Sequence, residues 1–134
     1  MGMQLPKRAG RKSKGIPKPL EKDIQRDILQ YLRLRGIFCW RQNSGAMQGE
    51  YKGKKRFVQF TSEPGICDII GLLPSGRLLA IEVKRPGGKA KEHQQSFIDQ
   101  INASNGIAVV ITSLSEVITL VDSLLAETTG LTHG

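Results

Sequence analysis

Two apolar segments that carry charged residues constrain this chain more than any other feature. They are residues 66–73 and 77–85, which read ICDIIGLL and RLLAIEVKR. Asp68 lies in the first segment, and Glu82 and Lys84 lie in the second. Burying an unpaired charge is costly. The three charges must therefore meet one another, or meet a partner of opposite charge, once the segments are folded.

The short connection between the two segments predicts how they face each other. We expect antiparallel strands joined by a three-residue loop, Pro74–Gly76, with the glycine in the left-handed conformation that such loops use. Asp68 then lies directly opposite Glu82, and Lys84 projects on the same face as Glu82. A two-residue loop would break this alignment. The segment LLAIEV is apolar on both faces, which indicates a central strand.

Two opposed carboxylates repel each other when their Cβ atoms are about 5 Å apart. Burial increases the repulsion unless a cation joins the pair or one acid is protonated. Hard divalent cations bind through one or two carboxylates and accept phosphate oxygens. The arrangement is therefore suited to metal-assisted hydrolysis of a phosphodiester, with Lys84 directed at the phosphate or the attacking water. The alternative is a solvent-exposed pair of Glu82 and Lys84 on an edge strand, with Asp68 in a turn.

The rest of the chain predicts one α/β domain, a mixed β-sheet flanked by helices on both faces. Helices are expected over residues 21–35, 90–105 and 113–127. Further strands are expected over residues 37–42, 57–60 and 107–112. The predicted order is α-β-β-β-β-α-β-α. The spacing from Ser113 to Glu116 suits a capping box at the start of the last helix. The segment between the strands predicted at residues 37–42 and 57–60 is interpreted as a polar loop.

Charge is concentrated at the N-terminus. Residues 1–20 contain six Lys or Arg and no acid, so they supply +6 of the net charge of +8. We interpret them as a disordered basic arm that contacts phosphates, with a merely solvated tail as the alternative. The folded domain is then expected over residues 21–127, with residues 128–134 frayed.

Cysteine content and hydropathy indicate a compartment. Cys39 and Cys67 lie in apolar runs without a CxxC pair, so we expect reduced thiols in a protein core. No apolar run approaches the ~20 residues that span a membrane, and the basic N-terminus lacks the apolar segment of a signal peptide. We expect a soluble, intracellular, cytoplasmic protein with no membrane contact and no organic cofactor.

The order Asp, hairpin, Glu-x-Lys resembles the signature of PD-(D/E)xK nucleases, and more closely the VRR-NUC family (virus-type replication-repair nucleases). The resemblance covers about residues 21–120. It rests on three blocks, EKDIQRDILQYLRLRGIFCWRQNSG, GICDIIGLLPSGRLLAIEVKRPGGK and EHQQSFID. It implies a restriction-endonuclease-like core, Mg²⁺ with Mn²⁺ as a substitute, and a DNA substrate. Phage or bacterial origin is also expected.

Carried over by position, the resemblance makes Asp68 and Glu82 metal ligands and Lys84 the catalytic lysine. The broader signature often has proline where this chain has Cys67, which is not a ligand in the pattern. Small stand-alone relatives resemble junction-cleaving enzymes that pair as dimers. The resemblance therefore implies a homodimer and a preference for branched DNA.

The same pattern includes an acid on the first helix and a glutamine on the next one. Glu21, one helical turn before Gln25, is the expected acid and assists in holding the metal; Asp23 is the alternative. Gln94 is the expected glutamine, with Gln95 as the alternative.

Several polar residues are expected to contact DNA, because a polyanion attracts clustered cations. They are Lys52, Lys54, Lys55, Arg56 and Arg85; the resemblance further implies that Arg41 and Ser44 border the site and contact DNA, with plain loop polarity as the alternative for these two. A solvated loop is the alternative for this set. Trp40 is either a core residue or a platform for stacking a base. The predicted dimer contact combines exposed parts of the C-terminal helix with Tyr31 and Leu34.

These features predict a Mg²⁺-dependent DNA endonuclease that selects branched DNA such as four-way junctions. Two alternatives stay open. One is a non-catalytic DNA-binding module that has kept the nuclease fold, and the other is a nuclease without junction preference.

Overall fold

The structure, a computed structural model, describes residues 20–42, 46–51, 54–59 and 63–133. Within these ranges the chain forms the following helices and strands, in order: α1 (Glu21–Leu34), β2 (Phe38–Arg41), β3 (Ala46–Tyr51), β4 (Lys54–Gln59), β5 (Ile69–Leu72), β6 (Leu78–Val83), α2 (Glu92–Ala103), β7 (Ile107–Ile111) and α3 (Leu114–His133).

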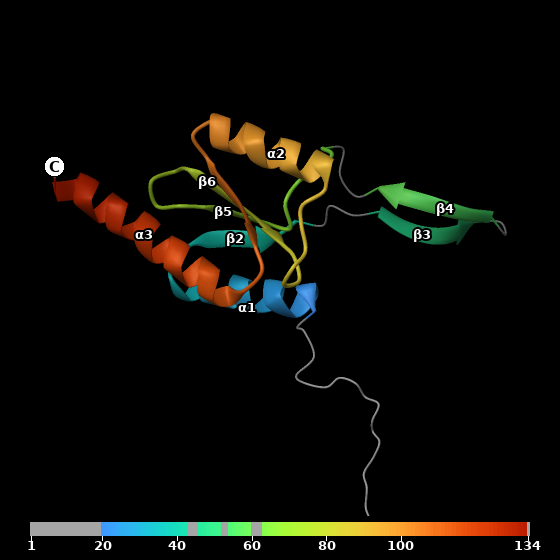
Figure 1. The fold of residues 1–134 in the computed structure, drawn as a ribbon, viewed down its shortest axis with the longest axis horizontal. Helices are drawn as coiled ribbons and strands as arrows, with labels where there is room; N and C mark the ends of the chain where they lie inside the picture. Colours follow the sequence, from blue (N-terminus) through green and yellow to red (C-terminus); the bar gives the residue numbers. More distant parts are fainter. Residues whose placement is uncertain (1–19, 43–45, 52–53, 60–62, 134) are drawn as a thin grey trace, which may run out of the picture.

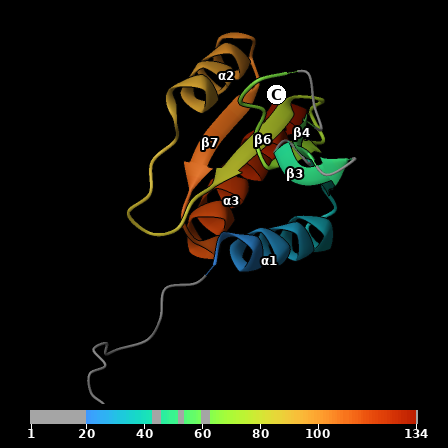
Figure 2. The same cartoon turned by 90° about the vertical axis from the view of Figure 1, so that its right-hand side faces the viewer.

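Four strands form a mixed sheet in the order β2-β5-β6-β7. Strand β5 runs antiparallel to both β2 and β6, and β7 runs parallel to β6. Helix α2 lies on one face of the sheet, and α1 and α3 lie on the other, as Figures 1 and 2 show from two directions. The predicted α/β class, a mixed sheet flanked by helices, is confirmed.

The predicted order was wrong in one element, strand β3. The segment interpreted as a polar loop contains β3, which pairs antiparallel with β4 as a separate two-stranded sheet. Strand β4 also begins at Lys54, earlier than the predicted start at residue 57. Glycines and charged residues give this segment a low strand propensity. Pairing with β4 nevertheless provides hydrogen-bond partners for the backbone of β3 along one edge. The two residues between the strands end in Gly53, and a connection of this length and composition is typical of a hairpin.

Helix α3 also differs from its predicted end, because it continues to His133 rather than stopping at residue 127. No proline interrupts residues 128–133, and a glycine inside a helix costs only about 1 kcal/mol relative to alanine. The predicted cap is present in altered form. The Ser113 hydroxyl accepts the N–H of Glu116 at 3.4 Å, whereas the Glu116 carboxylate accepts the N–H of Thr112 at 2.7 Å.

The register of the β5–β6 hairpin is the predicted one. Ile69 pairs with Ile81, and Leu72 pairs with Leu78. The N–H of Leu73 donates to the carbonyl of Arg77 at 3.0 Å, which closes the three-residue loop. The glycine of that loop has a φ of 91°, a conformation that favours glycine. Continued by one residue, this register sets Asp68 against Glu82.

Strand β6 is buried on both faces, as expected for a central strand. Leu79, Ile81 and Val83 pack in the core beneath α1 and α3. Ala80 packs in the smaller core beneath α2. Side chains alternate along a strand, so Glu82 projects toward α2 with Ala80. The site therefore lies on the α2 face of the sheet, at the end of its central strand.

Candidate active site

Glu82 is the buried charge at the centre of the site. Its side chain is 2% exposed. One carboxylate oxygen, Oε2, lies 3.3 Å from the Lys84 ammonium and accepts a hydrogen bond from the Gln94 amide at 2.9 Å. The other oxygen, Oε1, is buried and has no hydrogen-bond partner among the described residues. An unpartnered buried carboxylate oxygen is costly, and a cation could offset this cost by binding to it.

Asp68 is fixed by the backbone on both sides of β5. Its carboxylate accepts the N–H of Val83 at 2.9 Å, and its carbonyl accepts the N–H of Gln42 at 2.7 Å. These bonds tie the residue to β6 and to the chain that leaves β2. Asp68 therefore reaches the site from the start of β5, as the hairpin register predicts.

Burial and proximity perturb the two acids together. Burial raises the pKa of Glu82 to about 7, and the negative charge of Asp68 adds to the increase. Burial also raises the pKa of Asp68, although the N–H of Val83 opposes this. Lys84 lowers the pKa of both acids. Its single ammonium leaves both pKa values raised, so the site retains an affinity for further positive charge.

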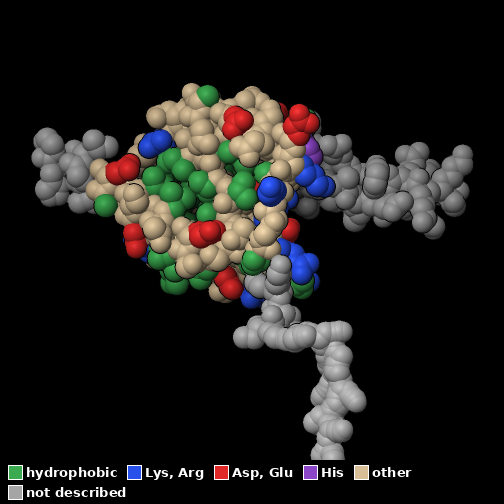
Figure 3. Space-filling view, in the orientation of Figure 1, with side chains coloured by type: hydrophobic (Ala, Val, Ile, Leu, Met, Phe, Trp, Pro, Cys, Tyr) green, Lys and Arg blue, Asp and Glu red, His purple; other side chains and the backbone are tan. Residues whose placement is uncertain are grey.

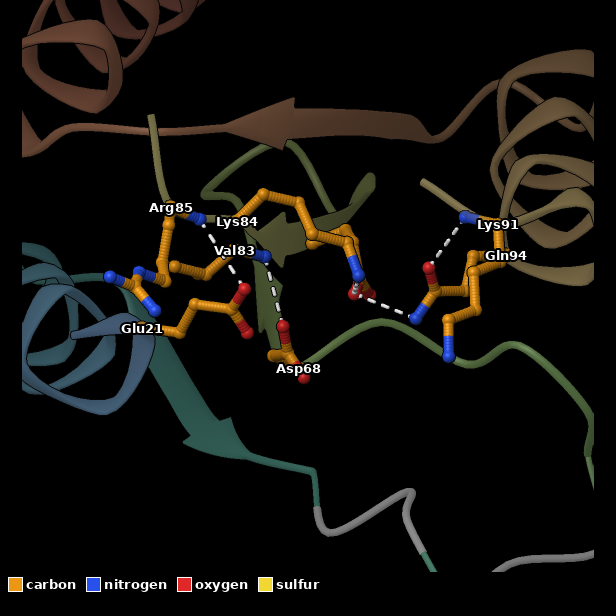
Figure 4. A network of polar contacts seen from close by, with 8 residues as sticks. Glu21, Asp68, Val83, Lys84, Arg85, Lys91 and Gln94 are labelled. Atoms are coloured by element: carbon orange, nitrogen blue, oxygen red, sulfur yellow. Dashed lines mark hydrogen bonds and ion pairs between the residues drawn. The ribbon is translucent and has the colours of Figure 1, made fainter. Parts of the chain in front are cut away.

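Glu21 approaches the pair from the first turn of α1. Its carboxylate accepts the N–H of Arg85 at 3.3 Å, and its negative charge raises the pKa of Asp68 and of Glu82. Asp23, the alternative acid, instead pairs with Arg26 at 3.3 Å on the exposed side of the helix. Figure 4 shows Glu21 and Asp68 on one side of Lys84.

Gln94 approaches from the opposite side, on the first turn of α2 (Figure 4). Its amide oxygen accepts the N–H of Lys91 at 2.8 Å, while its amide nitrogen donates to Glu82. The side chain thus ties the Glu82 carboxylate to the start of the helix. The neighbouring Gln95 donates to Asp99 at 2.9 Å on the exposed face and does not reach the site.

The donor set fits a hard divalent cation. Asp68 and Glu82 supply carboxylate oxygens, one of them unpartnered, and such cations bind through one or two carboxylates plus water. The described residues contain no group of three His, Cys, Asp or Glu side chains that could hold a metal ion. Glu21 lies beside the pair, where its charge raises the pKa of both acids.

Comparison with known proteins identifies the family of the chain and supports its fold. Residues 20–114 match the family model of the VRR-NUC domain. The chain belongs to the VRR-NUC family. A solved structure named "VRR_NUC domain" superposes with a TM-score of 0.55 at 19% sequence identity, covering 76% of this chain and 94% of that chain. No curated protein matches the chain. The family resemblance is thus confirmed, and the chain is a nuclease-type, DNA-processing VRR-NUC domain.

The residues of this VRR-NUC domain that were expected to bind DNA are spread over several segments. Arg41 ends β2 and Arg85 follows β6, and both are exposed. Ser44, Lys52 and the basic arm up to residue 19 lie outside the described residues. Three more basic residues belong to β4, where the backbone but not the side chains is described: Lys54, Lys55 and Arg56.

A glycine that we did not predict shapes the approach to Asp68. Gly65 has a φ of 75°, and a Cβ atom at this position would lie 2.1 Å from the carbonyl oxygen of His93 in α2. The close contact fixes the chain against α2 just before it enters the site. The Pro64-Gly65 pair signals a turn in the sequence, but the approach to a helix distant in sequence carries no local signal.

The remaining predictions concern exposure. Trp40 is 37% exposed, so it is not a core residue. Cys39 and Cys67 are both buried free thiols, as expected. Within the described part of the VRR-NUC chain, every helix is too short or too polar to cross a lipid bilayer.

Proposed function

We propose that this VRR-NUC domain is a Mg²⁺-dependent endodeoxyribonuclease that hydrolyses phosphodiester bonds. The observation that carries the proposal is the buried Glu82 carboxylate, which has one unpartnered oxygen and faces Asp68 beside Lys84. Asp68 and Glu82 would hold the ion, and Mn²⁺ would substitute for it. When bound, the ion would polarise the phosphate and lower the pKa of a water molecule.

The side chains around the acids have separate roles in this proposal. Lys84 stabilises negative charge that develops on the phosphate, because its side chain is only 13% exposed and its charge interacts strongly in a partly dry site. Gln94 orients the Glu82 carboxylate through its amide N–H. Glu21 adds negative charge near the acids and would assist in holding the ion, directly or through a water molecule.

Cleavage of DNA by purified variants tests the proposal. We expect cutting of circular and linear DNA in Mg²⁺ or Mn²⁺ and none in EDTA. Asp68→Asn, Glu82→Gln and Lys84→Met should each reduce the rate at least about 100-fold. Asp23→Asn, which removes an exposed acid outside the site, is the matched control. If Asp68→Asn cuts as fast as the unmodified protein, the proposal is wrong. DNA binding without any cutting would favour a non-catalytic module.

Phosphate contact by the basic residues is a further part of the proposed function. The basic residues Lys54, Lys55 and Arg56 lie in β4, which pairs with β3 in a hairpin separate from the four-stranded sheet (Figure 1). The chain carries a net charge of +8. Each Lys or Arg that neutralises a phosphate adds about 0.9 to the slope of log affinity against log salt. Replacing Lys54, Lys55 and Arg56 together by glutamine should reduce that slope by about 2 to 3. An unchanged slope would remove the hairpin from the DNA contact.

We also propose a homodimer that favours four-way junctions, since two strands must be cut. Val117 and Val121 are fully buried beneath the sheet, so they are not available for a dimer. Three half-buried apolar residues support a dimer contact at the β7 edge: Ile107, Val109 and Leu120. Figure 3 shows hydrophobic side chains gathered on this face, between α2 and α3. Sedimentation equilibrium should give twice the 14.8 kDa monomer mass. A monomeric mass would contradict the homodimer, and equal cutting of junctions and linear DNA would contradict the preference for four-way junctions.

A further inference from the structure

The sheet carries an uncovered aromatic surface beside the site. Phe38 and Trp40 of β2 and Leu72 of β5 are 68%, 37% and 39% exposed. Phe38 pairs with Leu72, and Trp40 pairs with Ile70. Ile70 belongs to the core beneath α2, so all these side chains project on the α2 face. Among the described elements, helix α2 packs chiefly on β6 and β7, and the three side chains on β2 and β5 are left partly exposed.

The two rings are held in a defined arrangement. Their centroids lie 5.4 Å apart with an interplanar angle of 53°. The indole N–H of Trp40 donates to the side-chain oxygen of Gln42 at 3.1 Å. The polar edge of the indole is thus satisfied within the protein, and its partly exposed apolar surface is available for stacking.

This surface is continuous with the proposed catalytic site. Gln42, which holds the indole, also donates its backbone N–H to the carbonyl of Asp68 at 2.7 Å. Trp40 faces Ile70, two residues beyond Asp68 on the same face. Two residues along a strand span about 7 Å, roughly twice the 3.4 Å rise between stacked nucleotides. A nucleotide one or two positions from a phosphate at Asp68 is therefore within reach of the ring.

We propose that Phe38, Trp40 and Leu72 form a platform that stacks an unpaired base of the DNA strand being cut. A base inside a duplex has both faces covered by its neighbours, so it must leave the stack before it can lie on a sheet surface, and an unpaired base does so at the lowest cost. Stacking on aromatic side chains accepts any base, because each base has a π-face. The substrate class is therefore DNA with unpaired nucleotides at the cut, such as a flap, a gap, a single strand or an open branch point.

Position favours a base over a second copy of the chain as the occupant. The platform lies at the β2 edge and adjoins the acids, whereas the proposed dimer contact lies at the β7 edge, on the opposite side of the four-stranded sheet. This inference rests on the proposed nuclease function, because it deepens the choice of substrate for the same site.

Tryptophan fluorescence tests the platform directly, because Trp40 is the single tryptophan of the chain. The titration is made in EDTA, which prevents metal-dependent cutting, and binding is followed in parallel by anisotropy of a dye on the DNA. A single-stranded oligonucleotide should quench Trp40 emission, whereas a blunt duplex should bind with little quenching. Equal quenching by both, or binding of single strands without quenching, would overturn the inference. So would emission that changes with protein concentration alone, which would identify a second copy as the occupant.

Variants give an independent readout. Trp40→Ala should weaken single-strand binding about tenfold and leave duplex binding unchanged, and Trp40→Phe should retain most of the affinity. Phe38→Ala is the second variant, since its highly exposed ring contributes little to folding. Asp23→Asn changes an exposed side chain on α1, away from the platform, and is the control variant. Uniform weakening toward both DNA forms would contradict stacking. A protein that shows selective quenching but never cuts would refute only the nuclease proposal.

Discussion

Asp68 accepts the backbone N–H of Val83 at 2.9 Å, and this bond holds its carboxylate across the hairpin from Glu82. The two acids are carried by neighbouring strands whose register the backbone fixes, so they cannot separate to reduce their repulsion. The folded chain therefore maintains an electrostatic cost at the site, which a bound cation would relieve. This relationship between two residues underlies the first three predictions.

The stability of the metal-free protein should depend on pH through Glu82. Its pKa is raised from about 4.5 to about 7, so between these values the folded chain binds a proton that the unfolded chain has released. The contribution of Glu82 to the free energy of unfolding is then greatest below pH 4.5 and is lost as pH rises to 7, by on the order of 3 kcal/mol. Urea unfolding in EDTA at several pH values measures it.

Glu82→Gln is the variant that isolates this dependence. It should be more stable than the unmodified protein at pH 8, and its advantage should shrink toward pH 5, since glutamine does not titrate. Added Mg²⁺ should stabilise the unmodified protein at pH 8 but not the variant. Parallel stability curves for the two proteins would show that Glu82 is not the titrating group.

Glu21 and Asp23 form a matched pair for testing the first helix. Glu21→Gln should reduce cleavage about 10-fold to 100-fold, because groups that support metal ligands act at that scale. Asp23→Asn should change the rate by less than about twofold, as its exposed ion pair with Arg26 contributes little. Cleavage rates of both variants at saturating Mg²⁺ decide between them. Equal losses would argue against a specific role for Glu21.

Gln94 and Gln95 form a second pair on α2. Gln94→Leu removes the N–H that stabilises the charged form of Glu82, so the pKa of Glu82 should rise further and the pH–rate profile should move to higher pH. Gln95→Leu loses only the exposed hydrogen bond to Asp99 and should leave the profile in place. A lower rate without a displaced profile would assign Gln94 a purely structural role.

Gly65 and Gly36 separate backbone strain from close packing. Both have positive φ values, 75° and 79°, but a Cβ at Gly36 meets nothing within 4 Å. Gly36→Ala should cost about 1 kcal/mol from strain alone. Gly65→Ala should cost more, because the added atom overlaps the carbonyl of His93, and it should also lower activity by displacing Asp68. Thermal melting and cleavage rates well below both melting temperatures measure the two effects; similar costs for the two variants would contradict this account.

The two thiols should be unreactive in the folded protein. Burial raises the pKa of Cys39, and raises that of Cys67 to about 12, so neither forms appreciable thiolate at pH 8. A thiol reagent such as dithionitrobenzoate should react slowly with the native chain and promptly with two groups per chain in guanidinium. Rapid reaction of the native protein would indicate an opening of the core.

The hairpin was predictable because its determinants are local. Pro74-Ser75-Gly76 sets the loop length, and the loop length sets the register that aligns Asp68 with Glu82. Strand β3 was missed since its own residues favour no strand and only pairing with β4 stabilises it. The end of α3 was missed for a related reason: Thr and Gly weaken a helix without stopping it.

The surroundings of the acids could be anticipated only in part. Helical spacing leaves Glu21 and Asp23 both possible, and the choice depends on where the chain leaving β6 passes α1. The exposure of Trp40 in β2 depends on how far α2, which packs on β6 and β7, extends across the sheet. The sequence around Trp40 carries no signal for this arrangement. Gly65 likewise contacts His93 at the start of α2, and strands β5 and β6 lie between these two residues in the sequence.

The separate pairing of β3 with β4 has a consequence for how such a chain can evolve. Adding or deleting one residue in the β5–β6 loop would move Glu82 to the opposite face of the sheet, so that loop can hardly change length. Within the described ranges, the β3–β4 hairpin shares no strand ladder with the four-stranded sheet, so it can lengthen, shorten or change charge without disturbing that register. Inherited variation in this lineage should therefore accumulate in the hairpin, where it can change the proposed contact with nucleic acid while the register that aligns Asp68 with Glu82 is passed on intact.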